Sequence, residues 1–229
     1  MMKNKNSMKI IKQTDLPAII KPYLSDRPII LEVGAFKGHD TVRLATAFPH
    51  CHIYAFEPVP ELFETLVEAT KLYSTITSVR AAVSDHDGMM PLYVAHKPNG
   101  KTTQASSLQK PKERLSHSPI TFPEAIMVPT INLATWAAAQ EIDNIDLLWL
   151  DTQGHEMTIL QSIQNSLLPC VRMIYTEVSF TEAYEGQAHA DTVIKWLKNA
   201  GFTPIAQDFT NPPTWFFGNI LFVRNDLAC

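Results

Sequence analysis

Cysteine is scarce in this sequence, which argues against two kinds of stabilised scaffold. The three cysteines, Cys51, Cys170 and Cys229, are odd in number and form no C-x-x-C pair. We therefore predict neither a disulfide framework nor a structural zinc site. Because Cys51 and Cys170 each precede a predicted strand, we expect both to be small buried hydrophobic side chains. We expect Cys229 to be a mobile terminal thiol.

Positive charge is also in short supply. Nineteen Lys and Arg residues against 23 Asp and Glu give a net charge of −4, whereas binding to a nucleic-acid backbone needs clustered basic residues. No apolar run is long enough for a transmembrane helix, and the lysine-rich segment 3–12 lacks the apolar core of a secretory signal. We expect a cytoplasmic protein whose partner is neither a nucleic acid nor a membrane. The oligomeric state stays open, a homo-oligomer included.

Glycine is sparse, but two of the eight glycines stand at informative places. An apolar run leads into Glu32, and Gly34 and Gly38 follow, which predicts a strand and a turn whose backbone can approach a ligand closely. A second apolar run, 53–56, ends at Glu57, at the spacing where a carboxylate meets ribose hydroxyls. The pair predicts a site for an adenosine-containing cofactor. The structural alternative is an ordinary turn in which both glycines only relieve strain.

The glycine pattern also indicates which cofactor is bound. Dinucleotide folds use G-x-G-x-x-G to seat a pyrophosphate, but here Glu32 occupies the place of the first glycine, giving E-x-G-x-x-x-G. A carboxylate there repels phosphate and attracts a cation. S-adenosylmethionine carries an ammonium and a sulfonium group and no phosphate. The pattern therefore favours a methyl donor over a hydride carrier.

Strands and helices alternate along most of the chain. Expected strands span 29–33, 52–56, 76–83, 146–150, 172–178, 202–206 and 216–223, and expected helices span 40–48, 61–73, 133–141, 156–164 and 191–200. This order predicts an α/β fold with a doubly wound, mostly parallel, seven-stranded Rossmann-like sheet. The terminal pair of strands suggests that the last strand runs antiparallel. An extra hairpin and loop interrupts the alternation.

A second polar cluster follows the strand 146–150. Asp151, Gly154, His155 and Glu156 lie between this strand and the next helix, at the sheet edge where open α/β sheets bind ligands. A helix N-terminus lowers the pKa of His155 and favours its neutral, proton-accepting form, whereas we favour a capping role for Glu156. Glu177 ends the next strand and is either a site residue or half of a structural ion pair. We favour the site.

Together these segments resemble the FkbM-type methyltransferases, S-adenosylmethionine-dependent enzymes that methylate hydroxyl groups of sugars and secondary metabolites. The resemblance covers residues 29–224 and rests on LEVGAFKG, YAFEPVPELFETL, AAVSDHDG, the SSL at 106–108, IDLLWLDTQGHEMTIL with IYTEVSF, and GNILFVR. The family usually carries D-x-E-G-x-E where this chain has Gln153 in the third position. Glutamine keeps the hydrogen-bonding reach but loses the charge.

The resemblance implies an S-adenosyl-L-methionine site and an acceptor that is a small molecule or a glycan. Together with the motifs above, it assigns the cofactor to Glu32, Gly34, Ala35, Phe36, Gly38, Glu57, Pro58, Ala82, Val83, Ser84 and Asp151. Methyl transfer needs alignment of an acceptor oxygen and a base for its proton. Our candidates for the catalytic residues are His155, Asp151 and Glu177. Two carboxylates are a thin basis for a divalent cation, so we predict no metal.

The chain divides into an N-terminal extension, 1–28, and a methyltransferase domain, 29–229. We expect residues 1–13 to be poorly ordered and 15–24 to form a short helix. Within the domain, 85–132 is an insertion in which strands 90–96 and 125–131 flank a loop rich in Pro, Ser, Lys and Thr. We interpret the loop as a lid over the acceptor; a plain surface insertion is the alternative.

Two other functions stay open at this point. One is a degenerate methyltransferase fold that acts as a binding module, which Gln153 would suit. The other is a nicotinamide-dependent oxidoreductase, which the missing dinucleotide pattern disfavours.

Overall fold

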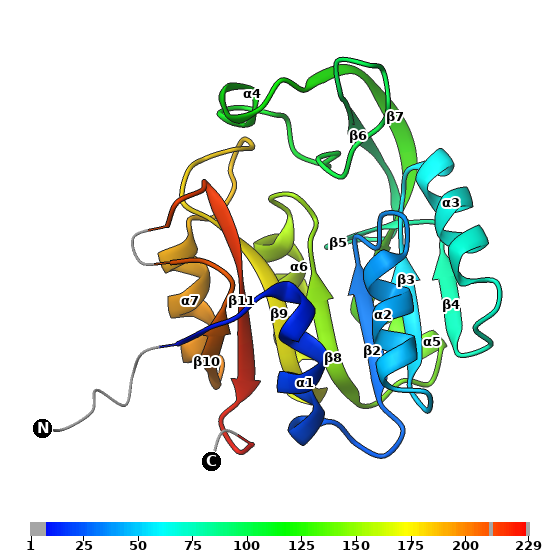
Figure 1. Cartoon of the computed structure of the whole chain (residues 1–229), viewed down its shortest axis with the longest axis vertical. Coiled ribbons are helices and arrows are strands. Elements are labelled where there is room, and N and C mark those ends of the chain that lie inside the picture. The colour runs from blue at the N-terminus through cyan, green and yellow to red at the C-terminus, as the bar shows by residue number, and fades with distance from the viewer. Residues whose placement is uncertain (1–7, 211–212, 228–229) are drawn as a thin grey trace, which may run out of the picture.

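The computed structural model describes residues 8–210 and 213–227. Within them lie a main sheet of eight strands, a second sheet of three strands and seven α-helices (Figure 1). The main sheet is ordered β1 (Lys9–Ile10), β10 (Phe202–Gln207), β11 (Phe217–Arg224), β9 (Val171–Ser179), β8 (Ile145–Leu150), β2 (Ile29–Val33), β3 (His52–Phe56) and β4 (Ile76–Val79). The second sheet is ordered β5 (Ala82–Ser84), β7 (Thr121–Asn132) and β6 (Gly88–His96).

The helices are α1 (Leu16–Ile20), α2 (His39–Ala47), α3 (Pro60–Thr70), α4 (Arg114–His117), α5 (Leu133–Ala139), α6 (Glu156–Ser162) and α7 (Ala190–Asn199). Short 3-10 turns occupy Gln13–Asp15, Lys21–Tyr23 and Leu168–Cys170. Central strands are buried on both faces, as in β8, where Leu148 and Leu150 pack with residues of α5, α6 and α7. The alternate residues Leu147 and Trp149 pack with residues of α1 and α2. Apolar side chains on both faces are what a helix-covered parallel sheet requires.

The predicted doubly wound sheet is confirmed. Strands β2, β3, β4, β8 and β9 pair in parallel, and β11 runs antiparallel to both of its neighbours, β9 and β10. The eighth strand was not predicted. Lys9 and Ile10 pair in parallel with Ala206 and Gln207, and the amide of Ile11 donates to the Gln207 carbonyl at 2.9 Å.

The expectation of disorder is therefore wrong for residues 9–13, because residues 9–11 pair with the open edge of β10 and a 3-10 turn begins at Gln13. For residues 1–7 the expectation lies outside the described residues, as does the one for Cys229. Cys51 is buried as predicted, whereas Cys170 is partly exposed, and both thiols are free.

The predicted strand 76–83 is two strands in different sheets. Val79 ends β4, where it pairs with Phe56, and Ala82 and Val83 pair instead with Thr130 and Ile131 of β7. A tight turn, in which the Ala81 amide donates to the Val79 carbonyl at 3.1 Å, separates them. Arg80 interrupts the apolar residues at this turn, but the turn contains neither Gly nor Pro, so the break between the two strands was missed. The switch carries the chain from the main sheet into the insertion.

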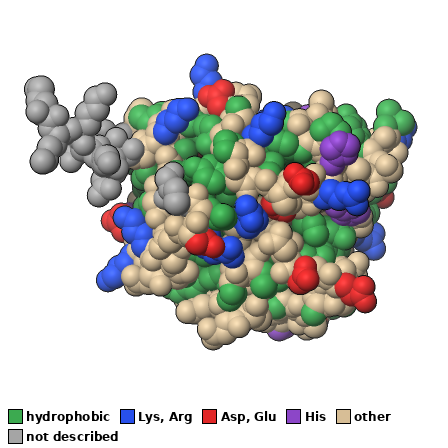
Figure 2. Space-filling view, turned by 90° about the horizontal axis from the view of Figure 1, so that it is seen from below, with side chains coloured by type: hydrophobic (Ala, Val, Ile, Leu, Met, Phe, Trp, Pro, Cys, Tyr) green, Lys and Arg blue, Asp and Glu red, His purple; other side chains and the backbone are tan. Residues whose placement is uncertain are grey.

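The insertion stands over one edge of the main sheet. In Figure 1, β6, β7 and α4 lie above the carboxyl ends of the parallel strands, and the described termini lie below. Figure 2 shows the opposite face, where Lys and Arg side chains are interspersed with Asp and Glu instead of forming one basic surface. Among the described residues, no helix combines the length and apolar character that a membrane crossing needs.

Candidate active site

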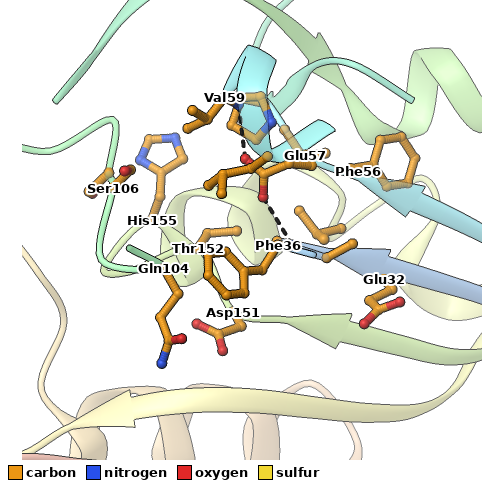
Figure 3. A pocket seen from close by; sticks show the side chains of 18 of the residues that line it. Glu32, Phe36, Phe56, Glu57, Val59, Gln104, Ser106, Asp151, Thr152 and His155 are labelled. Carbon is orange, nitrogen blue, oxygen red and sulfur yellow. Dashed lines mark hydrogen bonds between the residues drawn. The ribbon is translucent and has the colours of Figure 1, made fainter. Parts of the chain in front are cut away.

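A cavity of about 320 Å³ opens at the carboxyl ends of β2, β3 and β8 (Figure 3). Its floor consists of the loops that follow these strands, residues 34–38, 57–59 and 151–155. Its roof is segment 103–108 of the insertion. This is the edge of an open α/β sheet where ligands bind, and the volume suits a small-molecule ligand.

The two glycines of the first loop are required by protein packing. Both have left-handed backbones, with φ of 94° at Gly34 and 78° at Gly38. A Cβ on Gly34 would lie 1.9 Å from the carbonyl oxygen of Asp151, and one on Gly38 would lie 2.7 Å from Leu66. Gly34 lines the cavity together with Ala35, whereas Gly38 begins α2 outside the lining. For Gly38, these observations fit the structural alternative, in which the glycine serves the turn and does not contact a ligand.

Glu57 organises the first loop from the end of β3. Its two carboxylate oxygens accept hydrogen bonds from the amides of Phe36 at 3.0 Å and Val59 at 2.8 Å (Figure 3). The first bond holds Phe36 in a left-handed conformation, with φ of 52°. Burial raises the pKa of Glu57 to about 8 despite these bonds. The side chain also lines the cavity beside Pro58, and a carboxylate retains acceptor sites beyond two hydrogen bonds.

Glu32 is a buried carboxyl without a full set of partners. It is 2% exposed and lines the cavity, and its Oε2 has no hydrogen-bond partner among the described residues. Burial raises its pKa to about 8, although the nearby Thr41 hydroxyl opposes the rise. Asp40, Glu57 and Asp151 also line the cavity, while no described Lys or Arg does. A cavity of this charge fits a cationic ligand and not a pyrophosphate.

The loop after β8 is held together by Gln153. Its amide nitrogen donates to Asp151 Oδ1 at 2.8 Å and to Glu177 Oε2 at 3.0 Å. Its Oε1 lies 3.1 Å from the Tyr184 hydroxyl, whose one proton is shared between this oxygen and the Ala105 carbonyl. These partners fix the orientation of the amide. Glu177 accepts a hydrogen bond from this amide and lies outside the cavity lining, whereas the sequence analysis favoured a site role and gave an ion pair as the alternative. Burial raises the pKa of Glu177 well above its usual range, and that of Asp151 to about 6.

Glu156 closes the turn that carries Gln153. Its carboxylate accepts from the Thr152 amide at 2.7 Å, the Thr152 hydroxyl at 3.0 Å and the Gly154 amide at 3.1 Å. The role is structural, but these amides precede α6, so Glu156 fastens the turn before the helix and does not cap the helix itself, which is the role we favoured from the sequence. Burial raises its pKa to about 7.

His155 faces the cavity from the N-terminus of α6. Its Nε2 lies 3.0 Å from the Ser84 hydroxyl, and its buried Nδ1 has no hydrogen-bond partner among the described residues. The pKa is lowered as predicted, but burial is the main cause and Asp85 opposes it. Ser84 lies behind His155, outside the lining, whereas Ala82 and Val83 line the cavity. Figure 3 places His155 next to Ser106 of the roof.

Two buried hydrogen bonds fasten the roof, one to the floor and one to the loop that follows β9. The Ser107 hydroxyl donates to the Gln153 carbonyl at 2.7 Å, and the Tyr184 hydroxyl donates to the Ala105 carbonyl at 2.7 Å. Gln104, Phe217 and Asn219 also line the cavity, and none of them was predicted. The SSL segment was noticed only as part of a resemblance. Nothing in the sequence pattern showed that it meets the loop after β8.

Comparisons with known proteins agree with this geometry. Residues 32–204 match the family model described as the methyltransferase FkbM domain. Over 186 residues the chain is 30% identical to the 2-O-methyltransferase NoeI of Sinorhizobium fredii, which covers 79% of this chain and 74% of that protein.

Two solved structures share the fold at low identity. An rRNA methylase from Streptococcus thermophilus has a TM-score of 0.53 at 12% identity and covers 94% of this chain and 98% of its own. The magnesium protoporphyrin IX methyltransferase of Synechocystis PCC 6803, solved with bound S-adenosylmethionine, has a TM-score of 0.51 at 12% identity and covers 92% of this chain and 76% of its own.

The family model spans most of the chain, the relative is matched over most of its length, and the acidic cavity suits a cationic cofactor. The chain belongs to the FkbM family and is an S-adenosylmethionine-dependent methyltransferase.

Proposed function

We propose that this chain transfers a methyl group from S-adenosylmethionine to a hydroxyl group of a saccharide or secondary metabolite. The observation that carries the proposal is a cavity with four carboxyl side chains and no described Lys or Arg in its lining. Carboxylates attract the cationic donor and accept hydrogen bonds from acceptor hydroxyls. NoeI, whose name describes it as a 2-O-methyltransferase, supports an oxygen acceptor.

Different residues of the floor are assigned to different parts of the cofactor. We assign Glu32, whose Oε2 has no hydrogen-bond partner in the described part of the chain, and Asp151 to the charged amino-acid end of the cofactor. Glu57 is placed for the ribose, and Phe36, Ala82 and Val83 offer apolar contacts to the adenine. When bound, the cofactor supplies a methyl carbon activated by the sulfonium.

His155 is our candidate for the base. Burial keeps the imidazole neutral, and its Nδ1 is free of protein partners among the described residues. A neutral imidazole accepts the hydroxyl proton as the new bond forms. Asp151 lines the same cavity and is placed to orient the hydroxyl. Glu177 contacts Gln153 and not the cavity, so we assign it a positioning role through Asp151.

We further propose that segment 85–132 is a lid over the acceptor and that residues 1–28 form an extension of the methyltransferase domain. Roof residues 103, 104 and 106–108 line the cavity, which supports the lid. The free thiols of Cys51 and Cys170 suit a reducing compartment such as the cytoplasm.

The test has two arms. S-adenosylhomocysteine should raise the melting temperature of the purified chain while NAD leaves it unchanged. Methyl-labelled cofactor should then label methyl glycosides, with the label stable to alkali as an ether is. Stabilisation by NAD alone, or methyl uptake confined to amines, would overturn the proposal.

A further inference from the structure

The cavity has an acidic end and an apolar end. Burial, and after it the charges of Asp40 and Asp151, raise the pKa of Glu32, so these three acids of the lining lie close together. In Figure 3, Val59 lies beside Glu57 and away from Asp151. Six side chains of the lining belong to a separate hydrophobic cluster, namely Phe36, Val59, Leu62, Ala82, Leu92 and Leu108. The two ends therefore suit different parts of one ligand.

Two of these six side chains come from the insertion. Leu92 lies on β6 and is 2% exposed, and Leu108 ends the roof segment. The other four come from the first loop, from α3 with the residue before it, and from β5. Val128 of β7 is buried in the same cluster. The insertion therefore shares one apolar wall of the cavity with the elements that precede it.

The backbone sets both leucines on one face of the insertion. The Tyr93 amide donates to the Ser107 carbonyl at 2.8 Å, and the Ser107 amide donates to the Tyr93 carbonyl at 3.1 Å. Leu92 precedes this antiparallel bridge on β6 and Leu108 follows it on the roof segment, so the register sets the two leucines opposite each other. Opposed residues of an antiparallel pair share a face. Both side chains therefore reach the cavity together.

Glu57 connects the apolar end with the proposed ribose position. Its carboxylate accepts hydrogen bonds from the amides of Phe36 and Val59, whose side chains both belong to the apolar cluster. A ribose held by Glu57 therefore lies at the border of the apolar end, and the base attached to it extends into that end. A purine is flat and needs apolar contacts on both of its faces. The acidic end is left for the cationic groups of the cofactor.

We infer that Leu92 and Leu108 complete the adenine site, so that the insertion binds the cofactor as well as covering the acceptor. The inference rests on the placement of the cofactor in the proposed function. The first loop, α3 and β5 supply one set of apolar contacts, and the two leucines of the insertion supply the other. Their contact removes more apolar area of the base from water, which strengthens binding. Neither leucine was among the predicted cofactor-binding residues.

The test compares S-adenosylhomocysteine with adenosine, which lacks the amino-acid end. Leu108→Ala should raise the Kd of both ligands by the same factor, about 10-fold, since it removes apolar contact with the part they share. Glu32→Gln should raise the Kd of S-adenosylhomocysteine alone. Leu108→Met keeps the side-chain volume and should recover most of the loss. Leu115→Ala, at a residue 52% exposed on α4 of the same insertion and outside the lining, is the control.

Two further measurements separate binding from folding. Melting curves show whether Leu108→Ala is folded, and Leu92→Ala should give the same pattern of affinities from the other side of the bridge. In the wild type, adenosine should slow hydrogen exchange in segment 103–108 whereas L-methionine should not, and this needs no substitution. At saturating cofactor, the KM of Leu108→Ala for the methyl acceptor should stay within a factor of about two.

The outcomes distinguish this inference from the proposed function. A folded Leu108→Ala variant that binds S-adenosylhomocysteine like the wild type, that loses affinity for it but not for adenosine, or that changes only the KM for the acceptor overturns the adenine contact alone. The absence of protection by adenosine in the wild type does the same. A wild-type chain that shows the adenine contact but methylates no hydroxyl compound overturns the proposed function alone. Binding of neither ligand overturns both.

Discussion

The floor and the roof of the cavity are built by different kinds of contact. In the floor, Glu57 and Glu156 each bind amides within their own loop or the loop beside it. The roof depends on bonds between distant segments, such as Ser107 to Gln153 and Tyr184 to Ala105. The floor can therefore be recognised from short motifs, whereas the roof becomes visible only once the chain is folded. The same difference predicts how each responds to substitution.

The largest effect is expected in the floor at Gly34. Gly34→Ala places a Cβ 1.9 Å from the Asp151 carbonyl oxygen, which neither loop can avoid without backbone movement. We expect the free energy of unfolding to fall by at least about 3 kcal/mol. Gly100→Ala is the control, since its φ of 75° is also left-handed but a Cβ there has no neighbour within 4 Å. It should lose about 1 kcal/mol. If urea titrations show the same loss of unfolding free energy for both variants, the close packing of the two floor loops at Gly34 would be contradicted.

Glu57→Ala should weaken binding of S-adenosylmethionine about 100-fold, because it removes the ribose carboxylate and frees the Phe36 amide that shapes the first loop. Glu57→Gln should lose nearly as much, since its amide nitrogen would face an N–H donor at Phe36 or Val59. Glu61→Ala, an exposed acid on α3, serves as the control. Titration calorimetry measures the affinity of all three variants for S-adenosylmethionine. A Glu57→Gln variant that binds as tightly as the wild type would refute the role of the loop contacts.

Gln153→Glu tests the junction between floor and roof. It sets a third carboxylate against Asp151 and Glu177, where an amide nitrogen now donates to both. We expect a loss of about 2 kcal/mol at pH 8. The loss should shrink towards pH 5, because a protonated carboxyl can still donate one hydrogen bond. Gln161→Glu on the exposed side of α6 is the control. Melting temperatures of both variants at pH 8 and pH 5 measure this loss of stability. A loss that does not change with pH would argue against charge repulsion.

The affinity for the cofactor should depend on pH because buried carboxyl groups in the floor titrate. Burial raises the pKa of Glu32 to about 8, so at pH 6 this carboxyl is neutral and attracts a cation weakly. As the pH rises towards 8 the group ionises, and the affinity for S-adenosylmethionine should rise on the order of 10-fold. Titration calorimetry of the wild type and of Glu32→Gln checks this, since the variant should bind weakly and show a shallower profile, to which Glu57 and Asp151 still contribute.

The smallest effect belongs to the roof. Ser107→Ala removes one hydroxyl that donates to the Gln153 carbonyl and accepts from the Gln109 amide, and should lower stability by about 1 kcal/mol. Its KM for the acceptor should rise more than its Kd for the cofactor. Ser116→Ala, exposed on α4 of the same insertion, should change neither. A larger effect on the cofactor than on the acceptor would assign this part of the roof to the cofactor instead.

Features that depend on contacts between nearby residues could be predicted from the sequence, whereas features that depend on contacts between distant segments could not. Strands β2 and β3 were predicted at their observed limits because apolar runs and turn residues are local signals. The split of 76–83 was missed because β5 leaves the main sheet to pair with β7, far along the chain. Pairing of Lys9 and Ile10 with β10 was missed for the same reason. In the site, Glu32, Glu57, Asp151 and His155 were found by position, while Asn219 is held by Asp208, which follows β10.

The contact between Gly34 and the Asp151 carbonyl also bears on how this family should be classified. Two neighbouring strands end in loops that leave no space for a single methyl group between them. A descendant that had lost its catalytic activity would still need glycine there in order to fold. The presence of that glycine in a distant homologue is therefore a marker of architecture, and a search for functioning enzymes should rank sequences by their unpartnered cavity groups instead.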